Sequence, residues 1–392
     1  MVNTPAIRFK GFTDPWEQRK FSDVAVIRRG LTYSPTNIVD GADGVRVLRS
    51  SNINEDHFVL NDDDVFVDEG AVNIDLVHDG DILITAANGS PRLVGKRARI
   101  SALSGKTVHG GFMLVASSPC SDFLCASMGS SWYRRFLATG VAGGNGAIGN
   151  LDSKALGETT IAVPNDAEID KLGNFFTRLD HLITLHQRKY EKLSVLKKSL
   201  LEKMFPREGE NKPEVRFAGF TDPWEQRKLG ELSDIKTGDS DLQDADSNGI
   251  YPFFVRSEII ERSNRYLFDG EAILVPGEGK LGEIFHYING KFDYHQRVYK
   301  ISNFLNISGK FVYHAMQASF KKHALKNTVK ATVDSIRLPT LTEYEFMAPV
   351  SLREQREIVS SLDTLDNLIT LHQRKLEKLK QLKQSLLEKM FV

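Results

Sequence analysis

Three residues in the second half of the chain have the types and order of a metal-dependent nuclease centre. Asp269 is followed by Glu278 and then by Lys280. In some nucleases a D…E-x-K series of this kind holds a metal ion and a water molecule. The spacing is a common one, and the first half of the chain has no equivalent. A metal-dependent DNA nuclease therefore remains as one alternative function.

The glycines at 277, 279 and 282 have the G-x-G-x-x-G spacing of a dinucleotide site. Such a site needs a helix N-terminus directly after the glycines to bind phosphate. Residues 283–290 instead have a strand-like pattern that ends at Asn289 and Gly290. We therefore expect a hairpin turn here.

Other motifs that carry chemistry are missing from the sequence. It has no Walker A, Gly-x-Ser-x-Gly, His-Glu-x-x-His or Asn/Asp-Pro-Pro-Tyr/Phe adenine-methylation motif. Cys120 and Cys125 are the only cysteines and form a single C-x4-C pair, which is half of a structural zinc site. We expect two reduced, buried thiols, no metal-binding residues and no catalytic residues.

Composition places limits on the class of protein. The chain has 392 residues, 41% of them hydrophobic, which supports two or three domains. It has no apolar run of membrane-spanning length and no signal peptide, so we expect a cytoplasmic protein with no membrane partner. The formal net charge is zero, but charge is segregated. Residues 40–81 hold twelve acids, whereas residues 92–135 and 300–337 hold seven bases each.

Two long segments, residues 179–205 and 365–391, have nearly the same sequence. Their apolar residues recur at steps of three and four, with Lys, Arg and Glu between them, which predicts a helix with one apolar stripe. Leaving such a stripe exposed forfeits about 1.5–3 kcal/mol per large side chain. We therefore expect the two helices to pair as an antiparallel coiled coil. Two core helices, each packed in its own domain, are the alternative.

A second repeat precedes each half, because residues 8–20 (RFKGFTDPWEQRK) recur as residues 216–228 (RFAGFTDPWEQRK). The chain is thus a head, a variable middle and a helix, twice over. Within each head, an N-cap Asp followed by Pro predicts a short helix from Asp14 and from Asp222. We expect Trp16 and Trp224 to dock each middle onto the helices.

The two middles have patterns of mixed strand and loop. Strands are expected near residues 45–48, 65–67, 81–85 and 112–115, and near 251–255, 272–275 and 282–287. A helix is expected at about residues 309–325. Asn165 or Asp166, and Ser351, are expected to cap the long helices, which would then begin well before the repeat.

The duplicated DPWEQRK heads and LLEKMF tails, with Pro349-Val-Ser-Leu-Arg-Glu-Gln-Arg-Glu-Ile358 between them, resemble the specificity subunits of type I restriction-modification enzymes. Gly80-Asp-Ile-Leu-Ile84 and Tyr251-Pro252-Phe253 are similar to that family too. The first half departs from the pattern, because Pro164-Asn-Asp-Ala-Glu-Ile169 lacks the Glu-Gln pair of Glu354-Gln355.

The resemblance implies an α+β fold in which two mixed α/β target-recognition domains are separated by two long antiparallel coiled-coil helices, with a pseudo-twofold internal repeat. Each domain would read one half of a bipartite double-stranded DNA target, and the helices would set the spacing. Two modification subunits would dock on the helices, and restriction subunits would join through the complex. S-adenosylmethionine, ATP and Mg would be bound by those partner subunits, and no cofactor by this chain.

The predicted domain bounds are 1–164 for the first recognition domain, 165–212 for the first helix and linker, 213–349 for the second domain and 350–392 for the second helix. A purely structural coiled-coil adaptor is the second alternative function. It would need no basic loops.

Polar and basic residues in loops beside strands are the best candidates for contacts to bases and phosphates. The predicted DNA-binding residues are Arg46, Arg49, Ser51, Asn52, Asn88, Ser90, Arg92 and Lys96 in the first domain, and Arg256, Ser257, Lys280, His295, Gln296, Arg297, Lys326, Asn327 and Lys330 in the second. The predicted helix-pairing residues are Leu179, Leu182, His186, Leu193, Leu196, Leu200, Leu365, Leu368, His372, Leu379, Leu382 and Leu386. The two histidines are expected to fix the register of the pair.

Overall fold

The computed structural model describes residues 4–40, 44–142, 149–327 and 335–392. It divides into two compact units. Unit 1 comprises residues 1–186 together with 374–392, and unit 2 comprises residues 187–373. The division falls inside both long helices, α5 (Asp166–Lys203) and α9 (Leu352–Met390), so each unit contains part of each helix.

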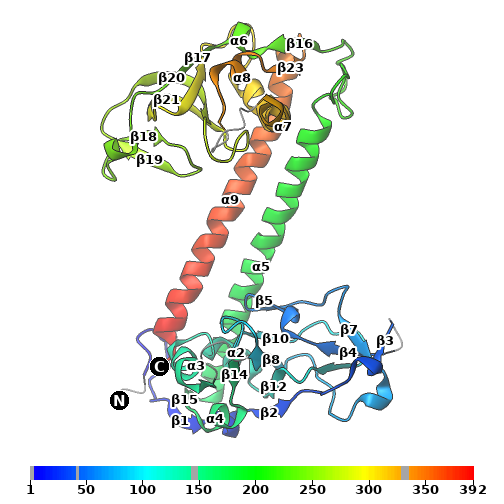
Figure 1. Cartoon of the computed structure of the whole chain (residues 1–392). Coiled ribbons are helices and arrows are strands. Elements are labelled where there is room, and N and C mark those ends of the chain that lie inside the picture. The colour runs from blue at the N-terminus through cyan, green and yellow to red at the C-terminus, as the bar shows by residue number, and fades with distance from the viewer. Residues whose placement is uncertain (1–3, 41–43, 143–148, 328–334) are drawn as a thin grey trace. The chain divides into compact units, whose positions relative to one another are not determined.

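Unit 1 is built on two four-stranded sheets (Figure 1). The first has the order β10 (Arg97–Arg99), β8 (Ile82–Thr85), β12 (Met113–Ser117), β2 (Val26–Arg29), and the second has the order β11 (Thr107–His109), β4 (Val45–Leu48), β7 (Val65–Val67), β3 (Ile38–Val39). Smaller pairings join β13 (Val141–Ala142), β14 (Gly149–Leu151) and β9 (Ala87–Asn88), β5 (Ile53–Asn54) with β6 (His57–Phe58), and β1 (Glu17–Lys20) with β15 (Thr160–Val163). The short helices are α1 (Phe21–Val24), α2 (Ser121–Ser127), α3 (Ser131–Gly140) and α4 (Ser153–Glu158).

The two central strands of the first sheet of unit 1, β8 and β12, are buried on both faces, and apolar residues fill all but the last position of each. Ile82 and Ile84 of β8 pack into the core that contains the helices, whereas Leu83 between them packs into a separate core on the opposite face. This is the period-two alternation of a strand with both faces covered. Because both faces of β8 are covered, apolar residues follow one another along this strand instead of alternating with polar ones.

Unit 2 contains one six-stranded sheet, ordered β17-β22-β20-β21-β18-β19. Its strands are β17 (Asp234–Thr237), β18 (Tyr251–Phe254), β19 (Ile260–Ser263), β20 (Phe268–Pro276), β21 (His286–Tyr294) and β22 (Val298–Ser302). Helix α7 (Gly309–Asn327) lies against β20 of this sheet (Figure 1), and Phe311 and Phe320 share one buried core with Ile273 and Val275. The remaining elements are α6 (Leu229–Leu232), α8 (Leu338–Thr342), and β16 (Glu225–Lys228) paired with β23 (Glu345–Ala348).

The expected strands in the middles are confirmed except the one at residues 282–287, and so is the helix beginning at Gly309. The corresponding strand, β21, begins only at His286 and continues through Asn289 and Gly290 to Tyr294, because its pairing with β20 extends past the predicted end. The glycines after β20 lie in the connection between antiparallel β20 and β21, as the hairpin prediction requires. Asn165 caps α5, since its side-chain oxygen accepts the backbone N–H of Glu168 at 3.0 Å. Ser351 likewise accepts the N–H of Glu354 at 3.4 Å. The two cysteines are free and only half-buried.

The predicted helices from Asp14 and Asp222 are wrong. The heads form strands instead: β1 pairs with β15, and β16 pairs with β23. In each case the partner strand lies directly before a long helix, so pairing places the head beside the start of that helix. This tertiary pairing overrides the local capping signal.

Each head is joined to the long helices by a cluster that is the same in both units, which we call the head cluster. In unit 1, Glu168 accepts hydrogen bonds from Arg8 at 2.7 Å and from the Trp16 indole at 3.2 Å. The Trp16 ring also packs on Phe391, which directly follows α9. Trp16 also packs on Phe123 of α2, so the prediction that this tryptophan docks the middle onto the helices is confirmed.

Unit 2 repeats the head cluster with equivalent residues. Glu354 accepts hydrogen bonds from Arg216 at 2.7 and 2.9 Å and from the Trp224 indole at 3.1 Å. The Trp224 ring packs on Phe205, the equivalent of Phe391. Glu168 and Glu354 are thus equivalent, and the first half lacks only the glutamine, Gln355, which accepts the Ser308 N–H and donates to the Pro349 carbonyl.

Within each unit the two helix segments run antiparallel. In unit 1 the Lys383 ammonium lies 2.6 Å from Asp180. In unit 2 the Lys197 ammonium lies 2.6 Å from Asp366. The two ion pairs are formed by equivalent residues of the repeat, so the helix segments have the same local arrangement in both units. Among the described residues, no helix is long and apolar enough to cross a lipid bilayer.

Candidate nucleic-acid interface

Three predicted DNA-binding loops of unit 2 meet at Glu278. Arg256 follows β18, Arg297 precedes β22, and Glu278 lies in the connection between β20 and β21. One carboxylate oxygen of Glu278 accepts a hydrogen bond from Arg256 at 3.1 Å, and the other accepts one from Arg297. We call these three residues the arginine cluster. Both arginines are about half exposed, so their remaining donors are accessible.

The backbone beneath the arginine cluster is held by several hydrogen bonds. The Arg297 carbonyl accepts the Gly277 N–H at 2.9 Å, and the Gly277 carbonyl accepts the Ile336 N–H at 2.8 Å. His295 is buried, and its Nδ1 accepts the Arg297 N–H at 2.9 Å. His295 is thus a support for Arg297 and not an exposed donor.

The charges in this region are largely compensated. Desolvation raises the pKa of Glu278, but hydrogen bonds from Arg297 and Arg256 outweigh it and leave the pKa below its ordinary value. Lys280 forms an exposed ion pair with Glu258 at 2.8 Å. Burial lowers the pKa of His295, which keeps the ring neutral at neutral pH.

The other predicted residues of unit 2 lie in different surroundings. Gln296 is exposed and donates to Asp241 at 3.0 Å, and the Ser257 carbonyl is hydrogen-bonded to His286. Lys326 and Asn327 are exposed at the end of α7, where Lys326 pairs with Glu208. These hydrogen bonds and ion pairs are all made with residues outside the arginine cluster. Lys330 lies outside the described residues.

In unit 1 the two predicted loops are brought together by a hydrogen bond from Asn88 to Ser50 at 3.3 Å. Ser51, Ser90 and Arg92 are exposed beside it, and Lys96 is half-buried. The Arg49 side chain donates to the Asp63 carbonyl at 3.2 Å. These loops form the candidate surface of unit 1.

Two predicted residues of unit 1 have structural partners instead. Asn52 is fully buried and donates to Asp64 at 2.7 Å and to the Val59 carbonyl. The Arg46 side chain is also largely buried, pairs with Asp64 and lies over the Phe66 ring. Both side chains bind partners inside the protein, so the structure does not support a DNA contact by Asn52 or Arg46.

The predicted helix-pairing residues have matching burial in the two copies. Leu179 and Leu365 are buried, and Leu182, Leu196, Leu368 and Leu382 are exposed by 37–48%. The half-buried residues are His186, Leu193, Leu200, His372, Leu379 and Leu386. Each of these residues is buried to a similar extent as the equivalent residue in the other copy of the repeat. Individual pairings remain predictions.

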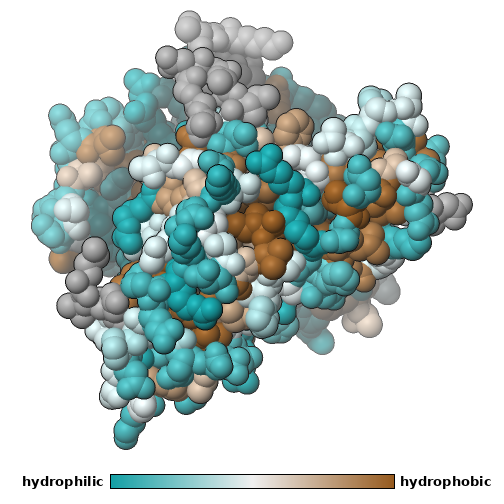
Figure 2. All heavy atoms as spheres, turned by 90° about the horizontal axis from the view of Figure 1, so that it is seen from below, coloured by the Kyte–Doolittle hydropathy of each residue, from teal (hydrophilic) through white to brown (hydrophobic). Residues whose placement is uncertain are grey.

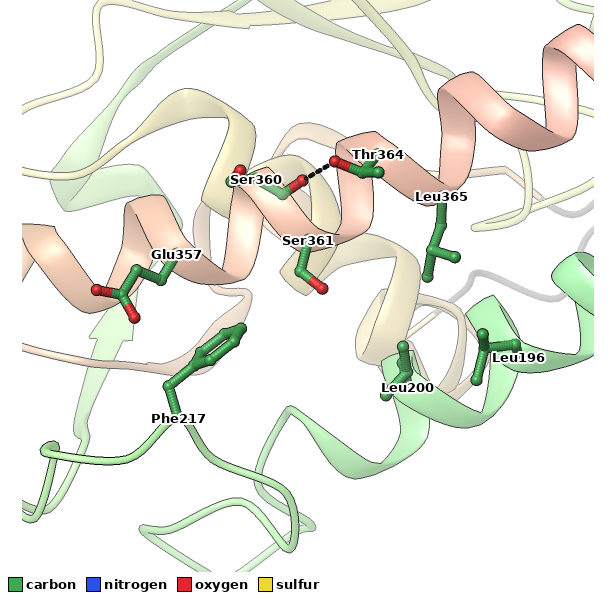
Figure 3. Close-up of a pocket in the computed structure, with 8 residues that line it drawn as sticks. All are labelled: Leu196, Leu200, Phe217, Glu357, Ser360, Ser361, Thr364 and Leu365. Atoms are coloured by element: carbon green, nitrogen blue, oxygen red, sulfur yellow. Dashed lines mark hydrogen bonds between the residues drawn. The ribbon is translucent and has the colours of Figure 1, made fainter.

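A pocket of about 580 Å³ opens beside the helices in unit 2 (Figure 3). It is lined by Leu196, Leu200, Phe217, Glu357, Ser360, Ser361, Thr364 and Leu365. In unit 1 the equivalent of Ser361 is Phe175, whose ring packs edge-on at 5.8 Å against Phe9, the equivalent of Phe217. A phenyl ring thus packs in unit 1 at the position where unit 2 leaves space.

The nuclease alternative is not favoured by the geometry. Asp269 lies near the start of β20, opposite Lys291, whereas Glu278 lies beyond the end of that strand. At about 3.3 Å per residue the strand separates them by about 20 Å or more. Within the described ranges, no group of three or more His, Cys, Asp and Glu residues is placed to hold a metal ion.

Sequence reasoning missed two roles. Glu278 was considered as a metal ligand, although it binds two arginines that were themselves predicted. Glu354 was singled out only as part of the Glu-Gln pair, and Glu168 was not recognised as its equivalent, although the identical Arg and Trp in both heads signal a shared acidic partner. Figure 2 shows hydrophobic residues gathered in separate patches among hydrophilic ones on this face.

Comparison with known proteins agrees with this organisation. Residues 221–381 match the family model described as the type I restriction modification DNA specificity domain. A crystal structure of the type I restriction-modification S subunit from M. genitalium has a similar fold, with a TM-score of 0.68 over 99% of both chains at 15% identity. The chain is therefore a two-unit protein with the fold of type I specificity subunits. The resemblance to that family, which the heads and tails of the sequence indicated, is confirmed.

The similarity in sequence to a particular relative is more local. Over 159 residues, which are 41% of this chain, the sequence is 35% identical to the type I restriction enzyme EcoDI specificity subunit of Escherichia coli. The match covers 35% of that relative, so the aligned part spans about a third of its length.

Proposed function

We propose that this chain is the DNA-recognition subunit of a type I restriction-modification complex, in which each unit reads one half of a bipartite duplex target. One observation carries the proposal: the segment that matches the DNA specificity domain contains the exposed arginine cluster. Arginine is suited to both phosphate and guanine contacts. The long helices would set the separation of the half-sites, as protein geometry does in other DNA-binding proteins.

In this proposal the chain has no catalytic role. Methylation and cleavage would belong to modification and restriction subunits, which would bind S-adenosylmethionine, ATP and Mg. This assignment is supported by the lack of catalytic motifs in the sequence and by the separation of Asp269 from Glu278.

Exchanging residues 21–178 for the corresponding middle of another specificity subunit is expected to change only one half of the target. The two middles have separate cores, which supports independent reading. Mapping methylated sites across a genome, with this chain as the only variable, gives the measurement. A chimera that altered both half-sites would contradict independent recognition.

We further propose that modification subunits dock on the helices and place an apolar side chain in the pocket of unit 2. The support is the equivalent position in unit 1, where Phe175 packs against Phe9. Ser361→Phe is expected to occupy this pocket and to weaken binding of one modification subunit about tenfold, roughly 1.4 kcal/mol. Calorimetric titration of the chain with modification subunit measures both affinity and stoichiometry.

Thr370→Phe is the matched control for this variant. It adds the same ring at an exposed position of α9 that does not line the pocket. Binding should stay at the wild-type level in this control. Equal binding of Ser361→Phe and the control would exclude the pocket as a docking site.

A further inference from the structure

The arginine cluster has an unusual feature for a surface that binds a polyanion, because a carboxylate lies between its two cations. The Glu278 side chain is 25% exposed, whereas Arg256 and Arg297 are 45% and 55% exposed. Each oxygen of Glu278 is used by a different arginine. A carboxylate at this position repels phosphate, so it opposes non-specific binding.

We propose that Glu278 is a positioning residue that sets the base specificity of unit 2 by holding Arg256 and Arg297 in one fixed arrangement. The inference rests on the proposed function and assigns the role of one residue within it. Glu278 itself need not touch DNA.

The chemistry of arginine explains why such a residue matters. A guanidinium group has five N–H donors in a planar fork, and each of the two arginines donates one hydrogen bond to Glu278. The remaining donors suit bidentate bonding to guanine O6 and N7, which discriminates against other bases by roughly 5- to 150-fold. A flexible arginine would bond to phosphate as readily as to a base. Fixing the fork before binding favours the base contact.

The backbone of the cluster is itself fixed, so Glu278 is a firm support. Glu278 forms a β-bridge with Ser335, and the adjacent Gly277 is hydrogen-bonded to both Arg297 and Ile336. His295 holds the Arg297 N–H from the other side. Three chain segments thus meet beneath the two arginines.

A nearby ion pair provides a matched control. Glu258 pairs with Lys280 at 2.8 Å, and both side chains are at least 64% exposed. Glu258→Gln and Glu278→Gln remove the same charge from the same region. Only Glu278→Gln releases two arginines, so a difference between the variants reports positioning and not net charge.

The test uses the full chain with its modification subunits, the duplex identified by methylation mapping, duplexes altered at single positions in either half-site, and an unrelated duplex. Fluorescence anisotropy gives the affinities over a salt series. Glu278→Gln is expected to bind unrelated DNA about three- to tenfold more tightly, with a steeper salt dependence. Its discrimination at one or more positions of the second half-site should fall about tenfold or more, while the first half-site is read as before.

Glu258→Gln should raise affinity for all duplexes alike and keep discrimination intact. Arg297→Lys keeps the charge without the fork, so it should lose discrimination without gaining non-specific affinity. This variant also decides the matter if Glu278→Gln fails to fold.

The inference is overturned if Glu278→Gln discriminates as well as Glu258→Gln, or if it loses both half-sites equally. A wild-type complex that distinguishes none of the duplexes would refute the proposed function, and this inference with it. The wild-type measurements therefore separate the two failures.

Discussion

Glu354→Ala is expected to destabilise unit 2 by about 3–5 kcal/mol, because it leaves a buried charge without its partner. Glu354 is only 1% exposed and accepts hydrogen bonds from Arg216 and from the Trp224 indole. The Arg216 side chain is 14% exposed, so water cannot readily replace the carboxylate. Urea unfolding followed by tryptophan fluorescence gives the measurement.

The structure supplies controls for this variant one turn away and in the other unit. Glu357 lies in an exposed pair with Arg353, so Glu357→Ala should change stability by about 0.5 kcal/mol or less. Glu168→Ala removes the equivalent carboxylate from the head cluster of unit 1 and should cost that unit a similar amount. If Glu354→Ala and Glu357→Ala unfolded alike, the head cluster would not be a major source of stability.

A fragment of residues 1–212 is expected to form a symmetric dimer at micromolar concentration. In the full chain, unit 1 includes residues 374–392 from the second helix. The fragment lacks them, but residues 186–205 match residues 372–391 except at Tyr190, Ser194, Val195 and Lys198. A second copy of the fragment can therefore supply the missing segment through a self-complementary interface.

Two contacts of unit 1 would be rebuilt in that dimer. Lys197 of one copy would meet Asp180 of the other, as Lys383 does in the full chain. Phe205 would take the place of Phe391 against Trp16. With modification subunits, the dimer should direct methylation to a palindrome of the first half-site.

Sedimentation of the purified fragment measures its association, and dimerisation near 1 µM corresponds to about 8 kcal/mol. The same fragment with Phe205→Glu is the control, because a carboxylate in the aromatic contact should weaken association. A folded, monomeric wild-type fragment would show that the apolar stripe is buried in some other way. The pairing model would then be rejected.

Much of the architecture could be predicted because duplication and periodicity are visible along the chain. The long helices follow from apolar residues at steps of three and four, with Asn165 and Ser351 marking where they begin. The resemblance carried by the heads and tails predicted the fold class, since two diverged copies of one plan require two similar units. The docking role of Trp16 and Trp224 followed from their identity in both heads.

Other features required the tertiary structure, because they depend on residues that are distant in sequence. Strand pairing with β15 and β23 decided that the heads are strands, although the local signal favoured helices. Burial decided that Asn52 is structural, since an asparagine in a polar loop has the same sequence signature whether it faces inward or outward. Glu278 gained its arginine partners only when three separate loops met, and no spacing along the chain encodes that contact.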